Sequence, residues 1–445
     1  MAQEGDTIFA LATPPGKSAI AVLRISGPQA AQAAMALGAK CPQAGRFSLA
    51  KLSGGNGQTL DEALLLFMAA PHSSTGEDVL EIHCHGGIAV VRSVLDRLSE
   101  FPGLRTAEPG EFTHRMFQND KIDLLGVEAL ADVIAADTGR QLDQAWAQMR
   151  GVLRDPATKW RQAIIRLSAE VEAIIDFPDE DIPPSVASSI TQNAETLITE
   201  IESCLNDDHI GEQIRDGVTI ALIGPANAGK STLLNHLARR PVAIVSDEAG
   251  TTRDVLSVSL DIDGVPVNLI DTAGIRENVG VVEAEGVRRA LSAARDADHV
   301  IMVLDGSDHD WPEQMQILAS QTAVPAMVVL NKSDRGIEGI PPENAAVMSL
   351  LRDQNLSAFE EKLTELVVAA NRSDGGSIIT RARHRQALLS TAHNLRAGLS
   401  IDLEISPEIV AEEFRAAAMA LGRITGEIEV EELLDSIFSS FCIGK

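Results

Sequence analysis

The chain contains no tyrosine, and aromatic residues make up only 3% of its 445 residues. Its core must therefore be built mainly from Leu, Ile, Val and Ala, and a hydrophobic content of 45% is sufficient for that. The chain also lacks any apolar run near the roughly 18 residues that a membrane-spanning helix needs, so we expect no membrane contact. Its first residues show no basic segment followed by an apolar core, so we expect no signal peptide.

Cysteine is also scarce. The chain has four cysteines, and their spacing matches neither a zinc site nor a disulfide framework. Scattered single cysteines are typical of proteins in a reducing compartment, and we predict a cytoplasmic location. The four are Cys41, Cys84, Cys204 and Cys442.

Positive charge is in short supply, since 37 Lys and Arg stand against 64 Asp and Glu and give a net charge of −27. Broad, non-specific binding of nucleic acid needs a basic surface, which this balance disfavours. Any role with nucleic acid must therefore use a local patch or a basic partner.

The composition changes along the chain and divides it into four predicted regions. Residues 1–118 alternate short apolar runs, at 19–25 and 62–69, with Gly- and Pro-containing turns, which predicts an α+β domain. Residues 119–213 are helical in pattern: Leu142, Trp146, Met149 and Leu153, and then Ile164, Leu167, Val171 and Ile174, recur at helical spacing. The prolines in the stretch 176–184 should end that helical run.

Residues 214–374 have the pattern of an α/β domain. Short apolar runs at 217–224, 265–271, 299–305 and 325–331 each end in a polar residue or Gly, and helical stretches separate most of them. This pattern predicts a mostly parallel sheet with crossover helices. Residues 375–445 are helical again, so we expect the α/β domain to be inserted between two parts of one helical domain.

A phosphate-binding loop is predicted at the start of the α/β domain. Gly224, Gly229, Lys230 and Ser231 form the pattern G-x4-G-K-S, after a predicted strand at 218–223 and before a helical stretch. Its backbone N–H groups can turn toward phosphate oxygens, Lys230 can reach the β- and γ-phosphates, and Ser231 can bind Mg²⁺. The flanking strand and helix disfavour the alternative of a chance glycine turn.

Three further elements follow in the order of a GTPase. Asp271 ends a strand and opens D-T-A-G, a second element that binds Mg²⁺; the pair Thr251 and Thr252 lies in a loop; and N-K-S-D at 331–334 follows another strand. A carboxylate such as that of Asp334 can accept hydrogen bonds from two N–H donors of guanine. The set resembles the translation-factor-like GTPases. The predicted GTP-binding residues are Asn227, Ala228, Gly229, Lys230, Ser231, Thr232, Ser246, Thr251, Thr252, Asp271, Thr272, Ala273, Gly274, Asn331, Lys332, Asp334, Ser349 and Leu350.

Two residues depart from the Ras-like pattern. Ile275 follows D-T-A-G, where Ras-type GTPases carry a glutamine that orients water, and an apolar side chain cannot do this. Asn227, inside the phosphate loop, has an amide oxygen that can help to hold a monovalent cation in place of an arginine finger.

The stretches 12–27, 110–130 and 271–277, together with the terminal C-x-G-K at 442–445, make the whole chain resemble the MnmE (TrmE) family of bacterial tRNA-modification GTPases. The resemblance implies an N-terminal domain that binds folate and dimerises, a discontinuous helical domain, and a G domain that dimerises with potassium and GTP. It implies a cytoplasmic homodimer that acts on tRNA in a heterotetrameric complex with the flavoprotein MnmG (GidA).

The implied reaction adds a carboxymethylaminomethyl or aminomethyl group to C5 of the wobble uridine of certain tRNAs. The one-carbon unit comes from 5-formyltetrahydrofolate or a related tetrahydrofolate, and the partner supplies FAD. Consistent with that division, no G-x-G-x-x-G follows a predicted strand in this chain.

Residue roles carry over from the resemblance at matching positions. It assigns potassium to Asn227, Ser246, Glu248 and Thr251, and Mg²⁺ to Ser231 and Thr252. It assigns the positioning of the attacking water to Glu283, three residues before Gly286; a solvated surface acid is the alternative for Glu283.

Folate is assigned to Arg24, Glu81, Lys121 and Lys445, for which ordinary surface charge is the alternative. Cys442 is a candidate catalytic residue, although a helix C-terminus disfavours a thiolate unless a cation such as Lys445 is near. Leu433, Ile437 and Phe441 recur at four-residue steps, which predicts an apolar face that docks the end of the chain.

Three alternatives of other kinds remain open. The chain can be a ribosome-assembly or regulatory GTPase of the Era or Der type, although it shows neither a KH-type G-x-x-G nor a second phosphate loop. It can be a folate-binding protein with a vestigial GTP site, which the intact GTPase motifs disfavour. His83 and His85 flank Cys84 as a possible metal pair, but side chains at alternate strand positions more often share a face without a ligand.

The one locally basic stretch contains Arg381, Arg383, Arg385 and Arg396. This helical face either approaches tRNA or the partner, or is simply a solvated surface.

Overall fold

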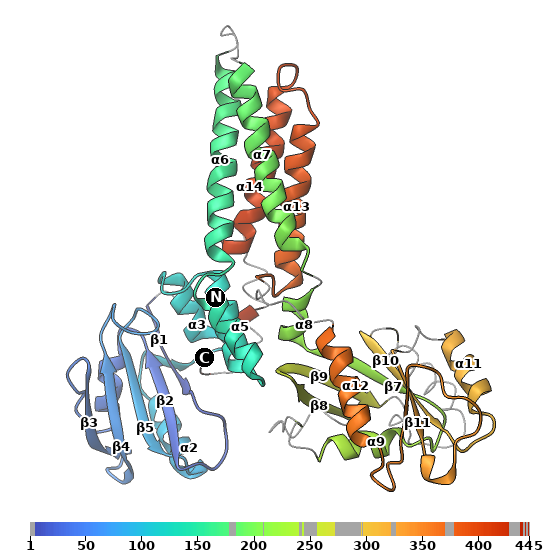
Figure 1. Cartoon of the computed structure of the whole chain (residues 1–445). Coiled ribbons are helices and arrows are strands. Elements are labelled where there is room, and N and C mark those ends of the chain that lie inside the picture. Colours follow the sequence, from blue (N-terminus) through green and yellow to red (C-terminus); the bar gives the residue numbers. More distant parts are fainter. Residues whose placement is uncertain are drawn as a thin grey trace, which may run out of the picture. The chain divides into compact units, whose positions relative to one another are not determined.

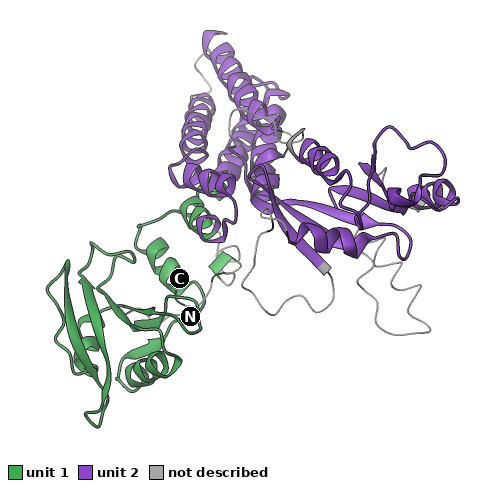
Figure 2. Cartoon of the chain, turned by 60° about the horizontal axis from the view of Figure 1, so that its bottom comes forward, with its two compact units in different colours: residues 1–131, 422–445 green, residues 132–421 purple. Residues whose placement is uncertain are grey.

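The computed structural model describes residues 5–177, 184–207, 209–239, 243, 256–271, 295, 297–321, 326–369, 378–426, 437, 438, 441 and 444. The chain forms two compact units, one of residues 1–131 and 422–445 and the other of residues 132–421 (Figure 2). Among the described residues, no helix is long and apolar enough to cross a membrane. The finer boundaries at residues 118, 213 and 374 stay a prediction.

The first unit contains a six-stranded sheet in the order β3(Arg46–Ser53), β4(Thr59–Met68), β5(Val79–His85), β2(Ile20–Ser26), β1(Thr7–Leu11) and β6(Leu104–Thr106) (Figure 1). All neighbours are antiparallel except the parallel pair β1 and β6. The runs at 19–25 and 62–69 are confirmed as strands β2 and β4. The prediction of an α+β domain is therefore confirmed.

The two faces of this sheet have different coverings. Helices α1(Ala30–Ala36) and α2(Ile88–Ser99) pack on one face, where Phe9, Leu23 and Leu80 are fully buried. The opposite face carries a smaller cluster of Ile8, Ala10, Ala107 and Phe112, the last from helix α3(Glu111–Gln118). Because side chains alternate along a strand, the polar residues of β2 and β5 that concern function lie on this second face.

The helical part of the chain comes from segments on both sides of the α/β domain. Helices α6(Arg154–Asp176), α7(Pro184–Leu205), α13(Ala382–Leu399) and α14(Pro407–Thr425) lie side by side (Figure 1). Residues Ile164, Leu167 and Val171 of α6 are buried as their spacing predicts. The insertion of the α/β domain into a helical domain is therefore confirmed.

Helix boundaries follow the proline signals. Helix α6 ends at Asp176, two residues before Pro178, and α7 begins at Pro184, a position where the missing N–H costs nothing. Helix α5(Gly139–Met149) is also correctly predicted, but Leu142 and Trp146 are 39% and 46% exposed while Gln148 is buried. The apolar spacing correctly indicates a helix, but it does not identify which face of that helix packs against the core. Two further helices are α4(Leu124–Ala135), which precedes α5 in the chain, and α8(Ile210–Asp216), which precedes β7.

The α/β domain has a second six-stranded sheet in the order β12(Ala345–Val347), β11(Met327–Asn331), β10(His299–Asp305), β7(Val218–Ile223), β9(Val265–Asp271) and β8(Leu256–Ile262). Every pair is parallel except β8 with β9. Helices α9(Lys230–Leu237) and α12(Leu356–Ala369) share one core cluster, and α11(Trp311–Gln321) contributes to the cluster on the other face. This is the predicted mostly parallel P-loop domain, and it brings the carboxyl ends of β7, β9, β10 and β11 to one edge.

Candidate functional site

The loop between β7 and α9 has the backbone of a phosphate-binding turn. Gly224, Asn227 and Gly229 all have positive φ, at 149°, 61° and 110°. A Cβ on Gly224 would lie 2.0 Å from the carbonyl oxygen of Val303, so this close approach requires glycine. The loop ends at the N-terminus of α9, where free backbone N–H groups favour an anion.

Lys230 lies over this loop. Its Nζ donates to the carbonyl oxygens of Gly224 and Pro225, each at 2.7 Å, and the residue is 5% exposed. These contacts hold the ammonium group above the turn, where a bound phosphate needs a positive charge.

Ser231 and Asp271, the two predicted Mg²⁺ groups on neighbouring secondary elements, meet directly. Strands β7 and β9 pair Leu222 with Asp271, so the end of β9 faces the start of α9. The Oγ of Ser231 donates to Oδ2 of the fully buried Asp271 at 2.5 Å. A hydroxyl and a carboxylate side by side are the hard oxygen ligands that Mg²⁺ prefers.

Asn331 connects the phosphate loop to the predicted guanine loop. Its Nδ2 donates to the carbonyl oxygen of Ala228 at 2.9 Å, and its Oδ1 accepts from the backbone N–H of Leu350 at 3.1 Å. Asn331 is 4% exposed, so both amide atoms are satisfied away from solvent. This one side chain therefore fixes the separation of the two loops.

The predicted base-binding residues gather around Asn331. The Oγ of Ser349, which is fully buried, donates to Oδ1 of Asp334 at 2.5 Å and so orients that exposed carboxylate. Lys332 has a φ of 63° and its Nζ pairs with Oδ2 of Asp305 at 2.6 Å. The structure thus brings together Asn331, Lys332, Asp334, Ser349 and Leu350.

Asp305 is a residue of this site that the sequence motifs did not predict. Burial alone would raise its pKa, but hydrogen bonds from Lys332 and Ser307 outweigh that effect and hold the pKa below its ordinary value. Asp305 therefore stays ionised and anchors Lys332. Its place as the last residue of a strand was the available signal, since Asp271 and Asn331 end strands in the same way.

Many predicted residues of this site lie outside the described residues. These are Ser246, Glu248, Thr251, Thr252, Thr272, Ala273, Gly274, Ile275 and Glu283. Of the predicted potassium set the structure describes Asn227, which is exposed at the tip of the loop. Thr232, also described, is exposed in the first turn of α9.

A second candidate site lies on the sheet of the first unit. Arg24 of β2 and Glu81 of β5 are direct partners in the sheet, and Nη2 of Arg24 lies 2.9 Å from Oε1 of Glu81. The guanidinium carbon is 5.9 Å from the ring centre of Phe112, a cation–π contact. The side chains of Arg24 and Glu81 are 28% and 15% exposed, so they stay accessible to a ligand.

Lys121 lies apart from this pair. Its Nζ donates to the carbonyl oxygen of Pro71 at 2.5 Å. Within the part of the chain that the structure describes, no hydrogen bond or ion pair joins it to Arg24 or Glu81. Lys445 and Cys442, the tail residues assigned to the same chemistry, lie outside the described residues.

The predicted docking of the chain's end is confirmed for the residues described there. Phe438 and Phe441 are 7% and 8% exposed and pack with Val127 of α4, with Ile437 beside them. A Cβ on Gly444 would lie 2.2 Å from the carbonyl oxygen of Leu11, so the backbone there touches the end of β1. Leu433 lies outside the described residues.

The histidine pair of β5 has ordinary partners. His85 Nδ1 lies 2.8 Å from Oδ1 of Asp61, and His83 Nε2 lies 3.4 Å from Oε2 of Glu81. Cys84 points to the other, buried face, and desolvation raises the pKa of its thiol to about 11. In the described residues no group of three or more His, Cys, Asp or Glu can hold a metal ion.

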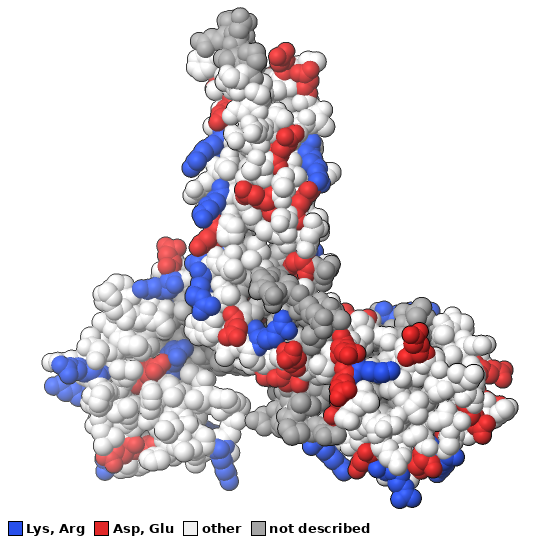
Figure 3. All heavy atoms as spheres, in the orientation of Figure 1, with Lys and Arg blue, Asp and Glu red and all other residues white. Residues whose placement is uncertain are grey.

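Two arginines of the basic stretch at α13 belong neither to a free contact surface nor to a solvated face. Arg381 pairs with Asp132 at 2.7 Å, and Arg385 pairs with Asp207 at 2.6 Å and Glu212 at 3.0 Å. Their side chains are 17% and 11% exposed, so acids of the same unit already neutralise them. On the face drawn in Figure 3, the basic side chains are interspersed with acidic ones.

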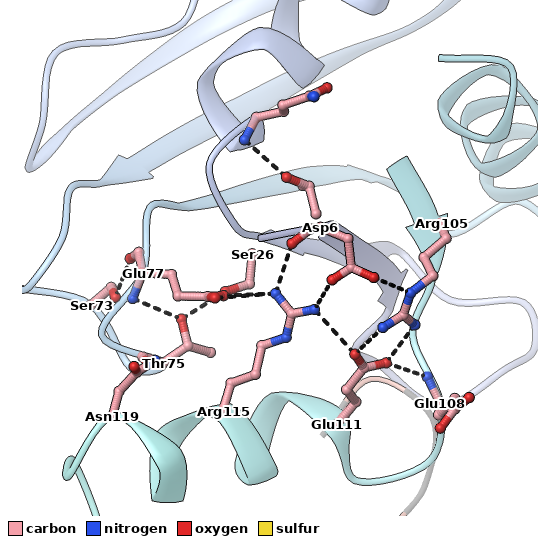
Figure 4. A network of polar contacts seen from close by, with 12 residues as sticks. Asp6, Ser26, Ser73, Thr75, Glu77, Arg105, Glu108, Glu111, Arg115 and Asn119 are labelled. Carbon is pink, nitrogen blue, oxygen red and sulfur yellow. Dashed lines mark hydrogen bonds and ion pairs between the residues drawn. The ribbon is translucent and has the colours of Figure 1, made fainter. Parts of the chain in front are cut away.

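A network of ion pairs surrounds helix α3 (Figure 4). Arg115 of α3 contacts Asp6 at 2.6 Å, Glu77 at 3.0 Å and Glu111 at 3.1 Å, and its side chain is 7% exposed. Arg105 contacts Asp6 at 2.5 Å and also pairs with Glu111. Burial alone would raise the pKa of Asp6 and of Glu111, but the two arginines hold both below their ordinary values.

Comparison with known proteins covers the whole chain. The descriptions "GTP-binding protein TrmE N-terminus" and "MnmE helical domain" match residues 7–121 and 124–442. A protein of Parvibaculum lavamentivorans named tRNA modification GTPase MnmE is 48% identical over 99% of this chain and 100% of its own length. A protein of the same name from a Bradyrhizobium species is 45% identical over 99% of both chains.

Among solved structures, the G domain of the T. maritima FeoB iron transporter matches 34% of this chain and 98% of that one. The identity is 23% and the TM-score 0.26.

Proposed function

This chain belongs to the MnmE (TrmE) family of tRNA modification GTPases, and from that premise we propose that it hydrolyses GTP to drive modification of tRNA. The observation that carries the proposal is the double contact of Asn331, which ties the phosphate loop at Ala228 to the base-binding loop at Leu350. Together with the contact between Ser231 and Asp271, it provides a cradle for a guanine nucleotide with Mg²⁺.

The roles at the GTP site follow from residue chemistry. Lys230 and the N-terminus of α9 bind phosphate oxygens, Ser231 and Thr252 bind Mg²⁺, and Asp334 accepts the guanine N–H donors. Glu283 positions the attacking water, because the apolar Ile275 cannot. The Mg²⁺ ion, when bound, neutralises charge that develops on the phosphates.

Potassium is the second cation of the proposal. The side chain of Asn227, with Ser246, Glu248 and Thr251, holds K⁺ next to the phosphates when two G domains dimerise. The exposed position of Asn227 at the loop tip supports this, because its amide faces a partner or solvent rather than the core.

The sheet site of the first unit binds 5-formyltetrahydrofolate or a related one-carbon tetrahydrofolate. Glu81 accepts from the N–H donors of the pterin ring, while Arg24, Lys121 and Lys445 attract the glutamate tail of the folate. The accessible ion pair of Arg24 and Glu81 supports the assignment. Cys442 acts at the same site, where the one-carbon unit is transferred.

The assembly that we propose is a cytoplasmic homodimer in a heterotetramer with the flavoprotein MnmG, acting on the wobble uridine of certain tRNAs. A chain with a net charge of −27 needs a partner that supplies most phosphate contacts. Arg381 and Arg385 support this division of labour, since their charges are already paired within the chain.

The deciding experiment is nucleoside analysis of tRNA from a strain in which the gene is deleted. We expect loss of the carboxymethylaminomethyl or aminomethyl group at the wobble uridine, and its return when the gene is restored. A full set of wobble modifications in the deletion strain would contradict the proposal. A defect in ribosome assembly in its place would favour the Era- or Der-like alternative, which full-length identity to MnmE proteins now disfavours.

A further inference from the structure

Helix α3 lies between the Arg24–Glu81 pair and the end of the chain. Its residues, 111–118, belong to a stretch on which the family resemblance rests, yet none of them has a role in the proposed function. Successive residues of the helix make contacts in different directions, and each direction leads to a different functional segment.

One direction leads to the ion pair on the sheet. Phe112 is 1% exposed and packs against Ile8, Ala10 and Ala107 on the face of the sheet that carries Arg24. Its ring lies beneath the guanidinium of Arg24. Because the ring is held by three neighbours, it limits where Arg24 can point.

A second direction leads to the C-terminal tail, by which we mean the described residues Ile437, Phe438, Phe441 and Gly444. The ring of His114 meets Phe438 edge-on, with centroids 4.8 Å apart and planes at 68°. Gly110, with a φ of 69°, has the backbone of Phe438 so close that a Cβ would lie 2.5 Å from its carbonyl oxygen. The first turn of α3 therefore forms the surface on which the tail rests.

The tail returns to the sheet beside Arg24. Phe441 N–H donates to the carbonyl oxygen of Phe438 at 3.1 Å. Gly444 then contacts the end of β1 at Leu11, and the residue before it, Ala10, is the sheet partner of Arg24. The tail thus contacts β1, the strand next to the one that carries Arg24.

Ion pairs anchor the helix between them. Glu111 and Arg115, one turn apart, are buried in the ion-pair network that joins α3 to Asp6, Glu77 and Arg105 (Figure 4). Phe112 and His114 are two residues apart on this helix and point to different sides. Because both side chains belong to one helix, a shift of that helix moves both of them.

We propose that α3 couples docking of the C-terminal tail to occupation of the Arg24–Glu81 site, with His114 as a positioning residue. The inference rests on the proposed folate function and adds a linkage to it. A ligand that orders Arg24 and Phe112 favours the position of α3 on which Phe438 docks, and a docked tail favours ligand binding by the same factor.

The test uses the full chain and 5-formyltetrahydrofolate. Affinity is measured by calorimetry, and hydrogen exchange of the 437–444 segment is measured with and without the folate. We expect His114→Ala to weaken folate binding about 2- to 10-fold, the range of one aromatic contact, and to abolish the protection of the tail by folate. His114→Phe should restore both, because it keeps the ring.

Two further variants sharpen the test. Phe438→Ala should have the same effect as His114→Ala, and the double variant should bind no more weakly than either single one, because the two rings form one contact. His85→Ala removes a ring of the same size from the same sheet, where it pairs with Asp61, and should change neither measurement.

The outcomes separate the coupling from the folate function. Normal folate affinity in both His114→Ala and Phe438→Ala overturns the coupling and leaves the folate site intact. Folate-independent exchange of the tail in the wild-type chain also overturns it. If the wild-type chain does not bind 5-formyltetrahydrofolate, the folate part of the proposed function fails, and the coupling fails with it.

Discussion

Lys230 and Ser231 are neighbours in the chain but hold different partners, one the carbonyls of the phosphate loop and the other the carboxylate at the end of β9. At the residue scale, the GTP site is a set of such short polar contacts. Each contact is made where the chain leaves a strand or enters a helix. Backbone groups at these ends have no partner within the strand or helix and stay available for other contacts.

Asn227→Gly tests the potassium assignment. Asn227 has a φ of 61°, which glycine adopts without strain, so the variant removes the amide and leaves the loop intact. We expect GTP hydrolysis by the wild-type chain to be much faster in KCl than in NaCl, and the variant to lose that difference. Equal wild-type rates in the two salts would contradict the assignment.

Glu283→Ala tests the positioning of water. We expect the rate of GTP hydrolysis to fall at least about tenfold, since general-base and positioning groups contribute that much or more. GTP affinity, measured by fluorescent nucleotide titration, should stay close to wild type. A large loss of affinity would make Glu283 a structural residue instead.

Gly229→Ala tests the contact between the two loops. A Cβ at residue 229 would lie 2.3 Å from Nδ2 of Asn331, and φ is 110°, so the variant must displace the Asn331 amide that joins the two loops. We expect GTP binding to be lost. Gly336→Ala is the matched control, since Gly336 has a φ of 99° with no atom within 4 Å of its Cβ. It also places a side chain at positive φ, but without the clash, and should still bind GTP.

At the element scale, α3 is held to its sheet by charges as well as by packing. The buried pairs of Glu111 with Arg105 and Arg115 replace water around each group, and the position of the helix depends on their staying ionised. The network has a definite direction of pH dependence, because the pKa values of both Asp6 and Glu111 lie below their ordinary range.

This network should lose stability in acid. A carboxylate whose folded pKa is lowered stabilises the fold above its unfolded pKa of about 4, and that contribution disappears as pH falls through the folded pKa. We expect the hydrogen-exchange protection of the 104–118 segment, taken relative to intrinsic exchange at the same pH, to fall below about pH 4. Glu111→Gln should accelerate exchange at neutral pH, by removing roughly 3 kcal/mol of pairing, and flatten the pH dependence.

Glu108→Gln is the control for this prediction. Glu108 is exposed and contributes only its backbone N–H to Glu111, which the variant keeps. An acid sensitivity in the 104–118 segment that is the same in Glu111→Gln as in the wild type would show that other groups control it.

At the scale of the whole molecule, one surface of the first unit supports the proposed homodimer. The edge strand β3 exposes Phe47 and Leu49 at 73% and 66%, and both face β4 partners on the sheet face opposite α1 and α2. Large apolar side chains on an edge strand invite pairing with another chain. The face of the sheet thus runs from this apolar edge through Arg24 and Glu81 to α3.

Phe47→Asp should convert a dimer to a monomer. A charge at this position would have to be buried without a partner in the dimer, which costs several kcal/mol. Light scattering after gel filtration measures the mass. Ile405→Asp, at a residue that is 78% exposed between α13 and α14, is the control and should stay dimeric. A dimer that persists in Phe47→Asp places the interface elsewhere.

The sequence by itself determined four of the six described strands of the G domain, β7, β9, β10 and β11, together with the phosphate loop and the insertion into a helical domain. These features depend on local backbone rules, such as glycine at positive φ and apolar residues at a strand or helix period, and those rules act over a few residues. The whole-chain resemblance to MnmE proteins determined the family for the same reason: the marking stretches are short and contiguous.

Tertiary structure alone decided which charges are used and which residues meet. Arg385 looked available in the sequence, but Asp207, nearly 180 residues earlier in the chain, neutralises it. Asp305 pairs with Lys332, which follows the neighbouring strand of the sheet. Gly110 contacts Phe438, although most of the chain lies between them in the sequence. Such contacts join residues that only the packing of the fold brings together, so no local pattern can specify them.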